Sequence, residues 1–171
     1  AVVIEDNHLE DVLFGVYIRH APGSIVRRNR LLSRVLPLPR RGDPIRVWYS
    51  DQVLIVGNVV QDGRDVVLWF SKGLTIRGND IRGGRYGLHF MYCHDAVVEG
   101  NHLEANSVGA YLMYSARLHV RGNRLLAHRG ASGYGLGLKD MEEVRIEQNI
   151  LADNRVGVFL EHASGAYTAN V

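Results

Sequence analysis

The sequence is poor in the features that mark several common protein classes. A single cysteine, Cys93, means that no disulfide can form within the chain. Four prolines in 171 residues are too few for a proline-rich linker. No apolar run approaches the roughly 18 residues of a membrane-spanning helix. We therefore expect a soluble globular domain rather than a disulfide scaffold or a helical membrane protein.

An excess of charge is also missing. Twenty basic and 18 acidic side chains leave a formal charge of +2, which is too little to predict nucleic-acid binding. One local run of arginines has no carboxylate between its first and last members: Arg27, Arg28, Arg30, Arg34, Arg40 and Arg41. It has two open interpretations, a solvated flank of a loop or a docking patch for an acidic partner.

Both ends of the chain read as parts of repeat units. Residues 1–5 contain no signal peptide and read as a strand, and residues 169–171 break off inside a further unit. We therefore expect a fragment of a longer protein, without the caps that close a solenoid.

The abundant feature is the repeat itself. An asparagine between apolar positions recurs at spacings of 22, 29, 21, 22, 22, 26 and 21 residues: Asn7, Asn29, Asn58, Asn79, Asn101, Asn123, Asn149 and Asn170. Apolar and polar residues alternate around it, with the period of two that indicates a strand with one buried face. A second strand, usually opened by glycine, follows about eight residues later.

Short strands at this period describe one turn of a β-helix. The sequence therefore predicts an all-β fold, a right-handed parallel β-helix (a solenoid) of about seven coils of 21–22 residues with a buried Asn ladder. An amphipathic helical repeat fails as an alternative because no i, i+3, i+4 stripe survives. Residues 1–171 form a single predicted domain, with insertions near 32–49 and 126–134.

Stacked coils would bring two thioethers together. Met91 and Met113 take the same position in successive units, which predicts that their two thioethers lie within about 5 Å of each other. Trp69 takes that position one unit earlier, where its ring could cover a cation.

Nearby side chains extend this pair to a soft-ligand cluster of the kind that selects Cu(I). A plainer interpretation stays open, in which the methionines fill gaps, the histidines lie on the surface and the cysteine is a small buried side chain. The candidate metal site consists of Met91, Met113, His89, Cys93, His94 and Trp69.

Two further classes of function remain as alternatives. A polysaccharide-modifying β-helix would need carboxylates along one outward ladder for acid–base chemistry. Asp65, Glu99 and Asp140 instead occupy different positions in their coils, which argues against that class. A polysaccharide-binding domain or a purely structural solenoid without a ligand would need no such ladder.

Three runs carry a family resemblance: GGRYGLHFMY at 83–92, GAYLMYS at 109–115 and YGLGLKDM at 134–141. They resemble the NosD family, accessory proteins in the maturation of nitrous oxide reductase. The resemblance is close over residues 51–162 and follows the repeat pattern elsewhere. It also implies a right-handed parallel β-helix, exported to the periplasm, with no enzymatic turnover of its own.

The resemblance also implies a set of partners. Members of the family dock on the membrane subunit of an ABC transporter, which makes them peripheral to the membrane. A copper chaperone lipoprotein and nitrous oxide reductase, with its tetranuclear copper–sulfide centre, are the further expected partners, and no nucleic acid is expected. Copper, as Cu(I), is the expected cofactor or cargo at the candidate site.

Overall fold

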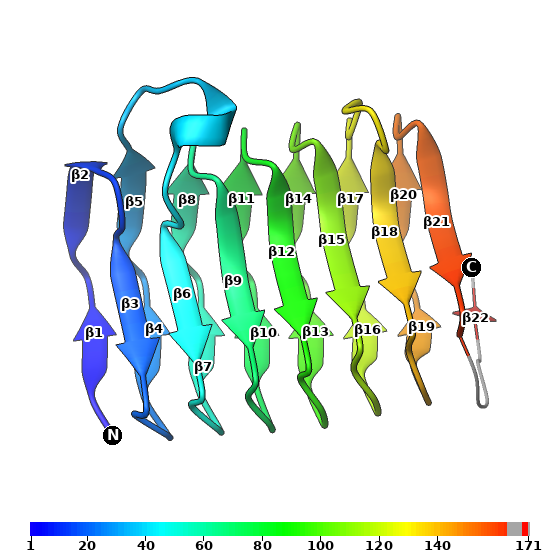
Figure 1. Ribbon diagram of the computed structural model, residues 1–171, viewed down its shortest axis with the longest axis horizontal. Helices are drawn as coiled ribbons and strands as arrows, with labels where there is room; N and C mark the ends of the chain where they lie inside the picture. The colour runs from blue at the N-terminus through cyan, green and yellow to red at the C-terminus, as the bar shows by residue number, and fades with distance from the viewer. Residues whose placement is uncertain (164–168, 171) are drawn as a thin grey trace.

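The computed structural model describes residues 1–163 and 169–170, and it shows a stack of parallel coils (Figure 1). Sheet A consists of β1 Val3–Glu5, β4 Ile25–Arg27, β7 Leu54–Val56, β10 Thr75–Arg77, β13 Val97–Glu99, β16 His119–Arg121, β19 Arg145–Glu147 and β22 Ala169–Asn170. Sheet B consists of β2 His8–Val12, β5 Arg30–Ser33, β8 Val59–Gln61, β11 Asp80–Arg82, β14 His102–Glu104, β17 Arg124–Leu126 and β20 Ile150–Ala152. Sheet C consists of β3 Val16–Arg19, β6 Ile45–Trp48, β9 Asp65–Trp69, β12 Tyr86–Met91, β15 Val108–Met113, β18 Tyr134–Lys139 and β21 Val156–Glu161.

The register of these sheets follows the sequence repeat. Ile76 of β10 lies opposite Ile55 in the preceding coil and Val98 in the following one, and the pairing is parallel. All three side chains are buried in the interior of the stack. The predicted all-β parallel β-helix is therefore confirmed, since residues one period apart lie in neighbouring coils.

The asparagine ladder is confirmed for the described side chains from Asn7 to Asn149. Each amide Nδ2 donates to the Oδ1 of the asparagine in the next coil, over 2.9–3.0 Å. The members from Asn29 to Asn123 are at most 2% exposed. A buried amide that is fully hydrogen-bonded fixes the register of the coils, because a slip would leave polar groups unpaired. The side chain of Asn170 lies outside the described residues.

The chain leaves each sheet C strand through a residue in the left-handed conformation. Phe70, Tyr92 and Tyr114 take this position in successive coils, with φ of 52°, 54° and 51°. The conformation costs a non-glycine residue roughly 1–2 kcal/mol. The three rings stack on one another at centroid distances of 5.2 and 5.1 Å, which helps to offset that cost.

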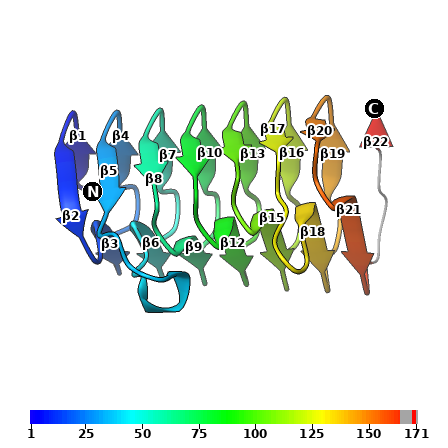
Figure 2. The same cartoon turned by 90° about the horizontal axis from the view of Figure 1, so that it is seen from above.

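Both insertions are shorter than the sequence indicated. The first spans residues 34–44, because 32–33 belong to β5 and 45–48 to β6, and it contains the 3-10 turn η1 Leu38–Arg40. The second spans residues 127–133, between β17 and β18. Strand β6 was missed because Pro44 stands where most repeats have their opening glycine and the strand follows directly on the proline-containing loop. The η1 loop projects outward next to β6 (Figure 2).

The arginine run contacts carboxylates of the preceding coil. Arg27 pairs with Glu5 at 2.6 Å, and Arg34 pairs with Asp11 at 3.1 Å. This pairing agrees with a solvated flank, and a docking role for the run stays a prediction. Within the described ranges, no helix has the length and apolar character needed to cross a membrane.

Candidate functional site

The outward face of sheet C carries the predicted column of methionines. Met91 lies opposite Trp69 in one neighbouring coil and opposite Met113 in the other. Trp48 and Lys139 continue the column in the two directions. Both methionine side chains are half-buried, so their sulfur atoms lie at the surface of the stack rather than in its core.

His89 also points outward from β12, because its neighbours Leu88 and Phe90 are fully buried in the core. It is nevertheless only 5% exposed. The rings of Trp69 and Tyr86 pack against it nearly at right angles, with centroids 5.3 and 5.0 Å away. An outward histidine is thus enclosed by aromatic side chains.

A buried carboxylate fixes the ring of His89. Its Nδ1 lies 3.1 Å from Oδ2 of Asp65. The guanidinium of Arg85 donates to both oxygens of this carboxylate, and the backbone N–H of Tyr86 donates to its Oδ1. Burial raises the pKa of Asp65, but the hydrogen bonds from His89 and Arg85 outweigh it, so the pKa is lowered overall.

This arrangement decides which atom of His89 is available. A carboxylate at Nδ1 favours the tautomer that keeps its proton there and leaves a lone pair on Nε2. Nε2 is buried and has no hydrogen-bond partner among the residues that the structure describes. His89 therefore has one ring nitrogen fixed by Asp65 and a second, buried nitrogen without a hydrogen-bond partner among the described residues.

A pocket of about 360 Å³ is lined by both His89 and Met91. We call it the sheet C pocket, and the first insertion forms one of its walls. Its lining residues are Phe14, Arg41, Gly42, Asp43, Arg46, Arg64, Asp65, Val67, Trp69, Arg85, His89 and Met91.

Cys93 does not join this cluster. Its thiol points inward, 3.0 Å from the carbonyl oxygen of Leu68, and it is fully buried. Its backbone N–H donates to the hydroxyl of Ser115 in the next coil, and the backbone N–H of Ser50 donates to Ser71 in the same way. Cys93 therefore takes the place of a serine in an inward ladder of serines. Burial raises the pKa of the thiol to about 12, which disfavours the thiolate that binds metals.

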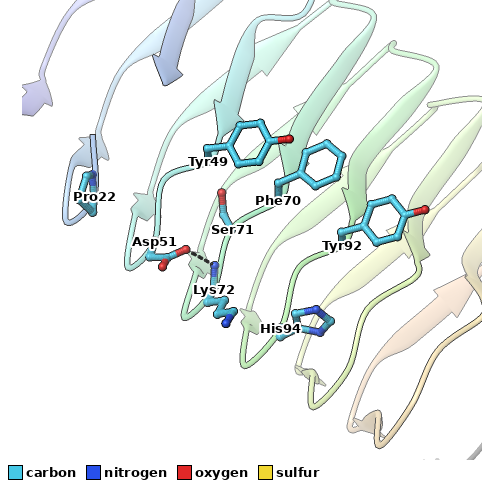
Figure 3. Close-up of a pocket in the computed structure, with 8 residues that line it drawn as sticks. All are labelled: Pro22, Tyr49, Asp51, Phe70, Ser71, Lys72, Tyr92 and His94. Carbon is cyan, nitrogen blue, oxygen red and sulfur yellow. Dashed lines mark hydrogen bonds between the residues drawn. The ribbon is translucent and has the colours of Figure 1, made fainter. Parts of the chain in front are cut away.

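His94 lies in a different place, beyond the corner that follows β12. Its Nδ1 accepts a hydrogen bond of 3.1 Å from the backbone N–H of Ala116. It lines a separate, open pocket of about 400 Å³, below the row of rings formed by Tyr49, Phe70 and Tyr92 (Figure 3). The structure therefore separates His94 from the methionine column.

Of the six predicted site residues, the structure thus brings four together: Trp69, His89, Met91 and Met113. Two thioethers and an imidazole nitrogen with an unpaired lone pair are a donor set that suits Cu(I), and a carboxylate behind the histidine is the usual second contact of a metal-binding histidine. Groups of three or more His, Cys, Asp and Glu placed to hold a metal are absent from the described part of the chain. The residues therefore fit a soft monovalent ion better than a hard or borderline divalent one.

Sequence reasoning missed the charged residues around the cluster. Asp65 stands at the glycine position of the repeat, and that departure was the signal that could have found it. Asp43 and Arg46 could not be placed, because they lie in or next to an insertion that breaks the repeat. Burial and the neighbouring Asp65 raise the pKa of Asp43, although Arg46 opposes the effect.

A solved structure shows the same fold. A mutant of the periplasmic alginate epimerase AlgG superposes with a TM-score of 0.75 at 17% identity, over 97% of this chain and 38% of that one. The chain therefore spans well under half of that protein. The surface protein and adhesin PfbA of Streptococcus pneumoniae gives a TM-score of 0.48 at 12% identity, over 98% of this chain and 64% of that one. A comparison with curated proteins gives no match.

The family comparison is more specific than the fold. The family model described as "Periplasmic copper-binding protein (NosD)" matches residues 23–170, which is most of the chain and includes all of the sheet C cluster. The chain belongs to the NosD family of periplasmic copper-binding proteins.

Proposed function

We propose that this chain is a periplasmic accessory protein that binds Cu(I) at His89, Met91 and Met113, with Trp69 beside the ion. The observation that carries the proposal is the buried Nε2 of His89, which lacks a hydrogen-bond partner within the described ranges and belongs to a ring that Asp65 orients. Met91 follows two residues later on the same face, and Met113 lies opposite it in the next coil.

Each residue has a separate role in this proposal. The two thioethers select a soft ion, because they bind Cu(I) well and compete poorly for hard cations. The imidazole adds a stronger donor, and its ring is already held in place by Asp65 before the ion binds. The ring of Trp69, opposite Met91 in the adjacent coil, can stabilise a monovalent cation by a cation–π contact.

Copper is cargo rather than a catalytic cofactor in this proposal, and the chain has no turnover of its own. The family resemblance supports a role in maturing the copper–sulfide centre of nitrous oxide reductase. The proposed partners are the membrane subunit of an ABC transporter and a copper chaperone lipoprotein. A rigid β-helix suits such a role, because it holds a site at a fixed position for docking.

An anaerobic Cu(I) titration against a chromophoric chelator tests the site. The double variant Met91→Leu/Met113→Leu keeps the side-chain volume and removes both sulfur atoms. We expect it to bind Cu(I) at least tenfold more weakly than the parent. The third methionine of the chain, Met141, is fully buried, and Met141→Leu serves as the matched control with unchanged affinity. Undetectable binding by the parent, or an unaffected double variant, would rule the site out.

The same histidine also supports a second candidate function, the binding or modification of a polysaccharide. An imidazole backed by Asp65 can act as a general base, and the arginines of the pocket could hold an acidic sugar. The fold likeness to an alginate epimerase agrees with this candidate but shows the fold alone. Incubation with oligouronates tests the modifying activity, since cleaved or epimerised products would require catalysis, whereas unchanged oligouronates would exclude it.

A further inference from the structure

The sheet C pocket is larger than a metal ion needs. Its volume is about 360 Å³, whereas a single water occupies roughly 30 Å³ of liquid. His89 and Met91 lie at one end of the pocket. Val67 pairs with His89 on one side and with Arg46 on the other, so Arg46 lies two coils from His89. Two coil spacings separate their backbones by roughly 10 Å. The pocket therefore has a second end that the proposed copper site does not use.

Unpaired hydrogen-bond donors lie on Arg46 and on two indoles next to it, of which Trp69 lines the pocket and Trp48 does not. Arg46 Nε, Trp48 Nε1 and Trp69 Nε1 are buried and have no partner within the residues that the structure describes. The guanidinium of Arg46 lies over both indole rings, 4.8 Å from the centroid of Trp48 and 5.5 Å from that of Trp69. Buried donors without an acceptor each cost about 1–3 kcal/mol, so the unpaired donors of Arg46 and Trp69, which both line the pocket, point to a ligand that supplies acceptor atoms.

The charges around the pocket favour an anion. Four arginines and two aspartates line it, an excess of two positive charges. Arg85 is committed to Asp65 through two hydrogen bonds. Asp43 faces Arg46 at 3.7 Å, which is too long for a hydrogen bond, so the guanidinium keeps donors to offer.

We propose that the Arg46 end of the sheet C pocket binds the carboxylate of a small organic acid, and that it does so without copper. A guanidinium pairs well with a planar carboxylate, and the indole N–H of Trp69 adds a donor on the same pocket. The volume leaves room for an organic body, and Phe14, Val67 and Trp69 give it apolar surface to lie against. A bare inorganic anion would leave that surface unused.

The intrinsic fluorescence of the chain offers a selective assay. Trp48 and Trp69 are the two tryptophans of the sequence, and the guanidinium of Arg46 lies over both rings, so a ligand bound to Arg46 should change their emission. Copper-free protein is titrated with D-glucuronate, with the neutral D-glucose as the matched sugar and sulfate as the inorganic anion. Because the attraction is partly electrostatic, binding should weaken as the ionic strength rises.

We expect a saturable change with D-glucuronate, a flat response to D-glucose, and at least tenfold weaker binding in Arg46→Gln. Arg124→Gln, which removes an exposed arginine from sheet B, is the control with unchanged affinity. If Arg46→Gln loses the β-sheet circular dichroism of the parent, Arg64→Gln on the same pocket replaces it. A flat response to D-glucuronate, an equal response to D-glucose, stronger saturation by sulfate or an unaffected arginine variant would each overturn the proposal. The copper proposal is tested with different variants, so either of the two proposals can fail without the other.

Discussion

The substitution Asn101→Ala tests whether the buried amide ladder holds the coils together. The Oδ1 of Asn101 accepts hydrogen bonds from the backbone N–H and the Nδ2 of Asn79, at 3.0 and 2.9 Å. Its own Nδ2 donates to the carbonyl of Ile76 and to Oδ1 of Asn123, both at 2.9 Å. The substitution therefore removes four hydrogen bonds at a site that is 1% exposed.

The expected cost follows from the groups that lose a partner. The backbone N–H of Asn79 and the carbonyl of Ile76 are left behind in the interior, and an unsatisfied buried group costs about 1–3 kcal/mol. The free energy of unfolding should therefore fall by about 2–6 kcal/mol, a large share of the 5–15 kcal/mol typical of a domain.

Urea unfolding followed by far-UV circular dichroism measures this change. The matched control is Asn7→Ala, at the exposed end of the same ladder, where water can replace the lost contacts and the expected cost is below about 1 kcal/mol. Equal losses in the two variants would refute the reasoning, because burial of the amide would then contribute nothing to its effect.

Three further substitutions test separate parts of the structure. Cys93→Ser should fold normally and keep its Cu(I) affinity within about twofold, because serine fits the inward ladder; a tenfold loss on titration would place the thiol in the site. Gly109→Ala should lower the thermal midpoint by several degrees, since the added carbon would lie 2.4 Å from a carbonyl oxygen, whereas Gly157→Ala has open space and should be neutral. Burial lowers the pKa of His128 to about 4, so its neutral form stabilises the fold above pH 6.5, and about 3 kcal/mol should be lost as the pH falls from 6.5 towards 4. His128→Asn should flatten that pH dependence in urea titrations, and an unchanged slope would contradict the assignment.

The sequence predicted the columns of the fold because a strict period leaves one way to stack the coils. The pairings of Met91 with Trp69 and Met113 follow from their spacing alone. The spacing could not show which way a side chain at a corner points. Cys93 and His94 lie within three residues of Met91, yet the chain turns between them and the column.

Burial of the outward face was also beyond the sequence. Alternation along β12 placed His89 outside, but its exposure depends on rings from other coils and on the insertion at 34–44. Residues of an insertion have no repeat to fix their position, so the contribution of Asp43 to the pocket could not be predicted. The sequence therefore predicted the column of the candidate site but not the residues that surround it.

Anomalous scattering at the copper edge, from a crystal grown anaerobically with Cu(I), tests the central claim most directly. The account predicts one strong peak within bonding distance of His89 Nε2 and of the sulfur atoms of Met91 and Met113. A peak at Cys93 or His94 instead, or a fully loaded crystal with no peak on the outward face of sheet C, would contradict it.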